Sequence, residues 1–208
     1  MNKEFLNTNF MKDLERMTGK EMDDIQQEDL NKIKRISFNA KHYEKDNIEF
    51  LLIDLKFLKN LEVVSFSGFQ FTQEEMITLK SFLNLNFISF DFCTFNLESF
   101  DFNDNVKYLS FNVCKNLKLS MLNNTKAISI KIVGSELEKQ HIDILDLKNA
   151  INLQELSLNN LVIKNINQLK SITPKLTQLN IDGSYIDENI EKVSFYVSHR
   201  EKFYRADA

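Results

Sequence analysis

The sequence has little of what marks several common protein classes. One proline and four glycines in 208 residues are too few for a long flexible linker or a turn-rich all-β chain. Two cysteines cannot build a disulfide framework, and no HExxH or paired CxxC motif provides a zinc signature. The formal net charge of −4 offers no overall cationic surface for phosphates, so we expect no nucleic-acid partner.

Long apolar runs are also missing. No stretch reaches the roughly 18 uncharged apolar residues of a membrane span, and the first residues mix charge with apolar side chains, unlike a signal peptide. We therefore expect a cytoplasmic protein with no membrane contact, and export as an effector stays open. Because 43% of the residues are apolar, the chain can bury a sizeable core.

What the sequence does contain is a repeat. In eight segments an apolar-x-apolar unit follows three residues after another position, which is apolar in seven of them and is Thr125 in the fifth. The apolar pairs are Ile36/Phe38, Val64/Phe66, Ile88/Phe90, Leu109/Phe111, Ile128/Ile130, Leu156/Leu158, Leu179/Ile181 and Val193/Phe195. The pattern leaves the residue between them free, yet that residue is serine in seven of the eight copies: Ser37, Ser65, Ser89, Ser110, Ser129, Ser157 and Ser194. This independent column supports the alignment.

The pattern resembles the leucine-rich repeat family, LxxLxLxxN/C, over roughly residues 30–198, with phenylalanine and isoleucine replacing many leucines. In the ninth position Cys93 and Cys114 match the family, whereas no copy has asparagine there. The resemblance implies a solenoid of stacked parallel strands whose usual asparagine ladder is absent or replaced.

The expected fold class is therefore α/β: a leucine-rich repeat solenoid with a parallel concave β-sheet of about eight strands and mixed helical and short convex returns. The divisions are an N-terminal helical cap over 1–30, the solenoid over 31–198 and a C-terminal tail over 199–208. In the cap, Gly19 is a suitable helix stop. An apolar stripe predicts a helix over 46–59, and capping-box patterns at Thr72 and Ser135 predict helices to Phe82 and to about Ala150.

Residues for catalysis do not come together in this pattern. His42, His141 and His199 fall far apart along a solenoid, so they cannot complete a nucleophilic triad, and the serine column is explained by an exposed sheet face. We expect Cys93 and Cys114 to be buried, reduced and unreactive thiols at a strand-to-return corner. No catalytic, cofactor-binding or metal-binding residue is predicted, and we do not expect an enzyme.

A partner-binding surface is predicted on the concave face. Val63, Phe87 and Tyr108 share a column next to the serines, and three more apolar residues mark the far edge of the strands: Phe92, Val113 and Ile132. Nearby charged residues form a polar rim: Asp91, Lys107 and Lys131. Exposed apolar surface with aromatic anchors is typical of an interaction site. The alternative is that the chain's own ends, or a second copy in a homodimer, cover this patch.

The function expected from this pattern is a protein–protein interaction module that binds a protein partner through the concave face of the sheet. The alternative is a recognition subunit of a larger assembly or an effector, of inhibitor, immunity or ligase type. An intrinsic enzyme is the least favoured hypothesis, because no convergent polar cluster accompanies the repeat.

Overall fold

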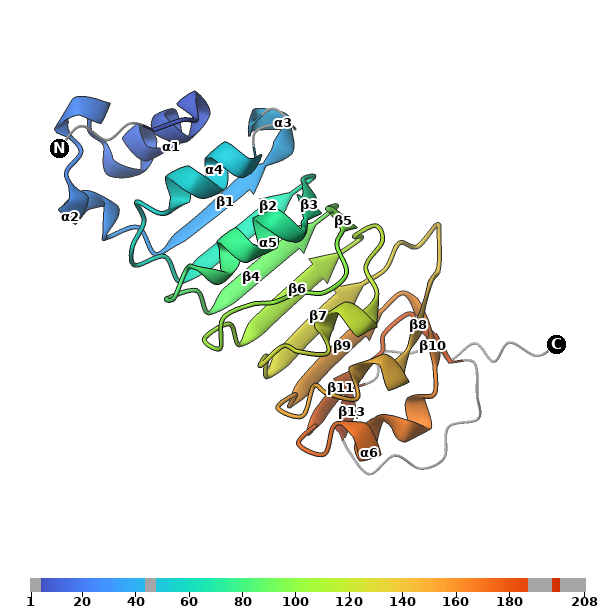
Figure 1. The fold of residues 1–208 in the computed structure, drawn as a ribbon. Coiled ribbons are helices and arrows are strands. Elements are labelled where there is room, and N and C mark those ends of the chain that lie inside the picture. Colours follow the sequence, from blue (N-terminus) through green and yellow to red (C-terminus); the bar gives the residue numbers. More distant parts are fainter. Residues whose placement is uncertain (1–4, 44–47, 187–195, 199–208) are drawn as a thin grey trace.

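Eight parallel strands form one sheet in the computed structural model, which describes residues 5–43, 48–186 and 196–198 (Figure 1). Their order is β1-β2-β4-β6-β7-β9-β11-β13, so each repeat adds one strand beside the previous one. The strands are β1 (Arg35–Asn39), β2 (Val63–Ser67), β4 (Phe87–Asp91), β6 (Tyr108–Asn112), β7 (Ser129–Val133), β9 (Glu155–Asn159), β11 (Gln178–Asn180) and β13 (Tyr196–Ser198). The predicted fold class, a leucine-rich repeat solenoid with a parallel sheet, is confirmed.

The strands stack because one phenylalanine of each early repeat packs on the next. The rings of Phe38, Phe66, Phe90 and Phe111 are stacked in succession, with centroid distances of 5.7, 6.0 and 5.4 Å. All four are almost fully buried, as are the matching Ile132 and Leu158 of later repeats. In a strand, alternate side chains point to opposite faces, so the intervening residues of the strands from β1 to β11 in this sheet face away from this core.

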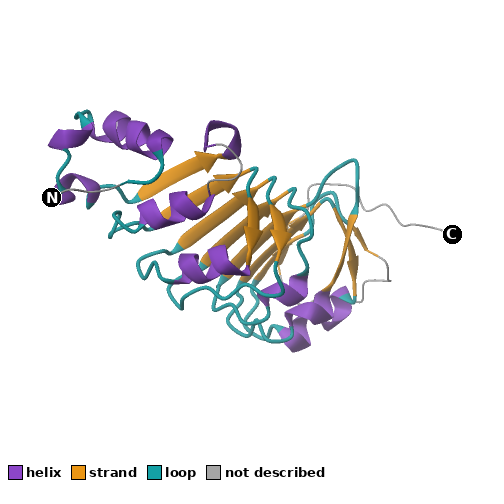
Figure 2. Ribbon diagram, turned by 45° about the horizontal axis from the view of Figure 1, so that its top comes forward, coloured by secondary structure: helices purple, strands orange, loops and turns teal. Residues whose placement is uncertain are grey.

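Helices and short 3₁₀ segments cover the core side of the sheet (Figure 2). They are α4 (Ile48–Leu55), α5 (Gln73–Lys80), α6 (Leu169–Ile172), η2 (Leu119–Leu122), η3 (Ile144–Leu147) and η4 (Ile166–Gln168). The capping box at Thr72 is confirmed, since the Glu75 carboxylate accepts a 2.7 Å hydrogen bond from the Thr72 N–H. The stripe over 46–59 forms α4, but this helix ends at Leu55, four residues before the predicted end at Lys59.

The predicted helix after Ser135 is wrong. The Ser135 hydroxyl accepts from the N–H groups of Leu137 and Glu138, but this closes only a turn. The chain then extends into β8 (Gln140–Asp143), which pairs with β10 (Leu161–Lys164), and β10 pairs in turn with β12 (Tyr185–Ile186). A second small sheet joins β3 (Gln70–Thr72) to β5 (Thr94–Asn96). These pairings between returns, which no local pattern marks, override the capping signal.

The N-terminal segment lies at the β1 end of the sheet (Figure 1). It consists of α1 (Thr8–Thr18), η1 (Met22–Asp24) and α2 (Gln27–Leu30), and α3 (Ala40–Tyr43) follows β1. Gly19 ends α1 with a left-handed φ of 69°. Two buried carboxylates fasten the segment: Asp13 accepts from the Tyr43 hydroxyl, and Asp54 of α4 accepts from the backbone N–H groups of Leu6 and Asn7.

The alignment of the fifth repeat is shifted by two residues from the sequence-based prediction. In the sheet Ser110 pairs with Lys131, whereas Ser129 pairs with Tyr108. Ser129 therefore belongs to the neighbouring column, and the other five predicted serines of repeats one to six share one row. The serine itself caused the error: Ile128-Ser-Ile130 keeps the serine column but is preceded by the polar Thr125, whereas Ile130-Lys-Ile132 is preceded three residues earlier by the apolar Ala127. The predicted eighth strand at Val193 lies outside the described residues; the strand paired with β11 is β13.

Candidate functional site

The face of the sheet turned away from the helices, here called the concave face, carries a short aromatic column. Val63 of β2 pairs with Phe87 of β4, and Phe87 pairs with Tyr108 of β6. Val63 and Phe87 are half-buried, and Tyr108 is 39% exposed. The column continues with Ser129, Glu155 and Gln178. After Gln178 the column ends at Tyr196 of β13. We call Val63, Phe87 and Tyr108 the aromatic patch, because apolar side chains occupy this column in three successive repeats.

A second apolar area lies at the opposite ends of the same strands. Phe92 follows β4 and is 61% exposed, and Val113 follows β6 and is half-exposed. A five-residue strand spans about 17 Å, so this edge pair, Phe92 and Val113, is separate from the aromatic patch. The serine row and the residues Asp91 and Asn112 lie between them. The predicted surface is therefore two apolar areas with a polar strip between, rather than one continuous patch.

The edge pair has unusual backbone geometry. Phe92 and Val113 have left-handed φ angles of 54° and 49°, at the position where other repeats have Gly68 (79°) and Asn160 (58°). Their N–H groups donate to the next repeat, Phe92 to the Asn112 carbonyl and Val113 to the Val133 carbonyl, which holds this conformation. Glycine and asparagine tolerate it, whereas a β-branched residue there is a conformational outlier. Two bulky residues thus occupy positions that favour small ones.

The remaining predicted site residues lie in different surroundings. Ile132 is 1% exposed, so its expected place on the surface is wrong; it is a core residue that pairs with Phe111. Its neighbour Lys131 is exposed in the serine row. Asp91 accepts a 3.2 Å hydrogen bond from the Ser89 hydroxyl in the polar strip. Lys107 lies beside Tyr108 and donates to the Asp104 carbonyl.

The two cysteines are buried at corresponding corners of neighbouring repeats, as predicted. Cys93 Sγ lies 3.5 Å from the Phe66 carbonyl oxygen, and Cys114 Sγ lies 3.2 Å from that of Phe90. Ser184 does the same in a later repeat, donating at 2.6 Å to the Leu158 carbonyl. These groups replace the asparagine ladder. Burial raises the pKa of the Cys93 thiol to about 11 and that of Cys114 to about 12, which disfavours reactive thiolates.

An asparagine ladder exists at the other corner, where the sequence analysis did not look for one. The side-chain amides of Asn60, Asn84 and Asn105 donate to backbone carbonyls of the preceding repeat, at 3.1, 2.7 and 2.7 Å. Each residue stands immediately before the first apolar position of its repeat, as Asn152 does too. A column of asparagines at that position was therefore visible in the sequence.

Within residues 5–43, 48–186 and 196–198, no three His, Cys, Asp or Glu side chains gather closely enough to hold a metal ion. His42 follows β1 and His141 lies in β8, whereas His199 is outside the described residues. Among the helices of the described chain, none has the length and apolar character needed to cross a membrane.

Solved structures of similar shape come from Listeria monocytogenes. The chain resembles internalin C2 with a TM-score of 0.56 and 17% identity, over 93% of each chain. It resembles InlP with a TM-score of 0.54 and 19% identity, over 88% of this chain and 60% of that one. No family model matches the sequence, and no curated protein is significantly similar to it. Internalins are leucine-rich repeat proteins, and the chain therefore has the leucine-rich repeat fold.

Proposed function

We propose that this protein is a recognition module that binds a protein partner through the concave face of its sheet. The observation that carries the proposal is the aromatic patch, in which Val63, Phe87 and Tyr108 leave apolar surface on the face that no element of the described chain covers. Aromatic side chains on a rigid frame contribute large contact area at small cost in conformational entropy.

The edge pair supports the same proposal. Residues in strained backbone conformations cost stability, and they persist where function requires them. Phe92 and Val113 adopt the strained conformation and present apolar surface. Other repeats have Gly68 and Asn160 at this position. A standard interface buries about 800 Å² per partner, which is enough to span both apolar areas and the polar strip between them.

The test is capture of partners from the native host, followed by affinity measurement with the purified partner. Phe87→Ala and Tyr108→Ala should each weaken binding by roughly 2 kcal/mol if these residues are hot spots. Ile77→Ala is the matched control, because Ile77 is 62% exposed on α5, on the opposite side of the sheet.

Two results would overturn the proposal. Unchanged affinity for both patch variants, with normal unfolding transitions, would place the binding surface elsewhere. Sedimentation of the wild-type chain as a dimer that the same two substitutions dissociate would show that the patch is a self-association surface.

A further inference from the structure

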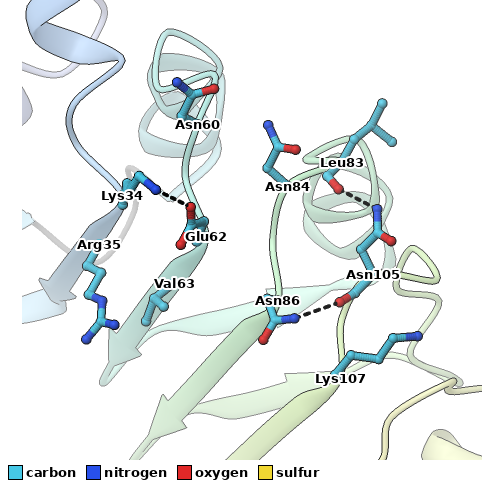
Figure 3. Close-up of a pocket in the computed structure, with 10 residues that line it drawn as sticks. All are labelled: Lys34, Arg35, Asn60, Glu62, Val63, Leu83, Asn84, Asn86, Asn105 and Lys107. Carbon is cyan, nitrogen blue, oxygen red and sulfur yellow. Dashed lines mark hydrogen bonds and ion pairs between the residues drawn. The ribbon is translucent and has the colours of Figure 1, made fainter.

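A groove follows the edge of the sheet at the N-terminal ends of β1, β2, β4 and β6. Its central cavity has a volume of about 660 Å³ and is lined in part by Lys34, Arg35, Glu62, Val63 and Lys107 (Figure 3). A second cavity of about 500 Å³ shares Leu83 and Asn84 with it, and a third of about 450 Å³ shares Lys34 and Arg35. These three neighbouring cavities, linked by shared lining residues, are here together called the rim groove.

The rim groove is cationic in a chain of net charge −4. Six cations line it: Lys32, Lys34, Arg35, Lys56, Lys59 and Lys107. Only two carboxylates do so, and both are already paired: Asp29 with Lys20 and Lys32, and Glu62 with Lys34 at 2.7 Å. In the described part of the chain, Arg35, Lys56 and Lys59 have no carboxylate partner, so the groove has an excess of cations.

The rest of the lining suits a peptide. The amide nitrogens of Asn84 and Asn105 are held by the asparagine ladder, which leaves their oxygens as fixed acceptors at the groove (Figure 3). Such acceptors match peptide N–H groups. Leu83 is 68% exposed and Met17 43% exposed, so the groove also offers apolar contacts. The only aromatic ring in the lining, that of Phe82, is 8% exposed and offers no stacking platform for bases.

From this combination we propose that the rim groove binds an acidic segment of the protein partner, with apolar residues among its carboxylates. The proposal rests on the proposed function, because Val63 belongs to both the groove and the aromatic patch, so one partner can contact both. Charge complementarity at the groove would orient the partner and accelerate its association, while the aromatic patch would supply most of the affinity.

The groove can be tested without the natural partner. The probe is a short fluorescein-labelled peptide of alternating glutamate and leucine, and its binding to the full-length protein is followed by fluorescence anisotropy. The same peptide with glutamine in place of glutamate is the neutral control. The acidic peptide should bind more tightly than the neutral one, and its affinity should fall as ionic strength rises.

Charge reversal locates the site. The double variant Arg35→Glu with Lys59→Glu should weaken peptide binding roughly tenfold or more, since both residues line the groove and have no carboxylate partner among the described residues. The matched control is Lys118→Glu with Lys148→Glu, which changes the net charge equally at two exposed residues outside the groove lining. The control should bind the peptide almost as the wild type does.

Three results would overturn the assignment. Equal loss in both double variants would show a long-range effect of net charge, and equal affinity for acidic and neutral peptides would show that the cations have no role. Equally tight binding of a labelled single-stranded oligonucleotide, with the same dependence on Arg35 and Lys59, would show a general anion surface. Because the patch variants are measured with the natural partner, failure of the groove assay alone leaves the proposed function standing. Failure of the patch variants with normal peptide binding would instead overturn the proposed function and leave only a peptide-binding groove.

Discussion

The first four repeats and the three that follow them are built on the same frame but have different side chains on both faces. The inward column is phenylalanine from β1 to β6, and it changes to Ile132 and Leu158 in β7 and β9. The concave column changes at the same place, from the aromatic patch to Ser129, Glu155 and Gln178. The aromatic patch, the strained edge pair and the rim groove therefore all belong to the first four repeats. Stacking is needed along the whole solenoid, whereas the features proposed for recognition are concentrated in the first four repeats.

The largest expected effect concerns the phenylalanine core. Phe90 is fully buried and its ring contacts those of Phe66, Phe71, Phe95 and Phe111, so Phe90→Ala should cost about 3–5 kcal/mol by leaving a cavity. The equivalent Leu158→Ala in the later half should cost less, because the lost side chain is smaller. Urea unfolding of the two variants measures the difference. Equal destabilisation by the two substitutions would contradict the view that the core is stabilised more strongly in the early repeats.

The edge pair gives a smaller effect of opposite sign. Val113→Gly should stabilise the protein by about 1 kcal/mol, because glycine adopts the left-handed conformation without the steric cost of a β-carbon. Gly68→Ala, at the same position of an earlier repeat, should destabilise it by about 1 kcal/mol, because the new β-carbon meets the Ala40 β-carbon at 3.4 Å with φ at +79°. Thermal unfolding of both variants checks the pair. A destabilising Val113→Gly would show that the valine is there for packing.

The smallest expected effect is a dependence of protein stability on pH that arises in the N-terminal segment rather than in the repeats. Hydrogen bonding to Lys20 lowers the pKa of Asp29 from 3.8 to about 2, so its stabilising contribution is present above pH 4 and is lost as the pH falls towards 2. Burial raises the pKa of Asp54, so the contribution of that group changes in the opposite sense and falls as the pH rises above 3.8.

Asp29→Asn should therefore flatten the acid limb of the stability curve, measured by urea unfolding from pH 2 to 5. Asp104→Asn, at an exposed residue of a later loop, is the control and should leave the curve unchanged. An acid limb that stays as steep in Asp29→Asn as in the wild type would place the acid sensitivity outside this segment.

The sequence predicted the features that recur in every repeat, such as the strands and their buried residues. It missed those that depend on contacts between the segments that connect the strands. The register of the first four strands followed from the apolar pairs, because Phe38, Phe66, Phe90 and Phe111 must stack. Because side chains alternate with a period of two, the two-residue shift in the fifth repeat kept the inward and outward faces correct. It nevertheless placed Ile132 just beyond its strand, whereas in the sheet Ile132 lies within the strand and pairs with Phe111. The pairing of β8 with β10 could not be predicted, because it joins segments that share no periodic signal.

Within the site, the aromatic patch was visible as a column of residues, but the left-handed backbone of Phe92 was not. That conformation follows from the bond of its N–H to the Asn112 carbonyl of the next repeat, which only the stacked structure defines. The rim groove was missed for a similar reason. Its cations come from loops and strand ends that are far apart in sequence, and only stacking brings Arg35 and Lys107 to one cavity.

Hydroxyl-radical footprinting of the protein alone and with its partner tests the central claim most directly. In the free protein, at concentrations below self-association, Tyr108 and Phe92 should be oxidised readily because their rings are exposed. In the complex, oxidation should fall at Phe87, Tyr108 and Phe92 and stay unchanged at Ile77 on α5 and at Leu145 in the later half. Protection confined to Ile77 or Leu145, with Tyr108 and Phe92 as reactive as before, would contradict recognition by the concave face of the early repeats.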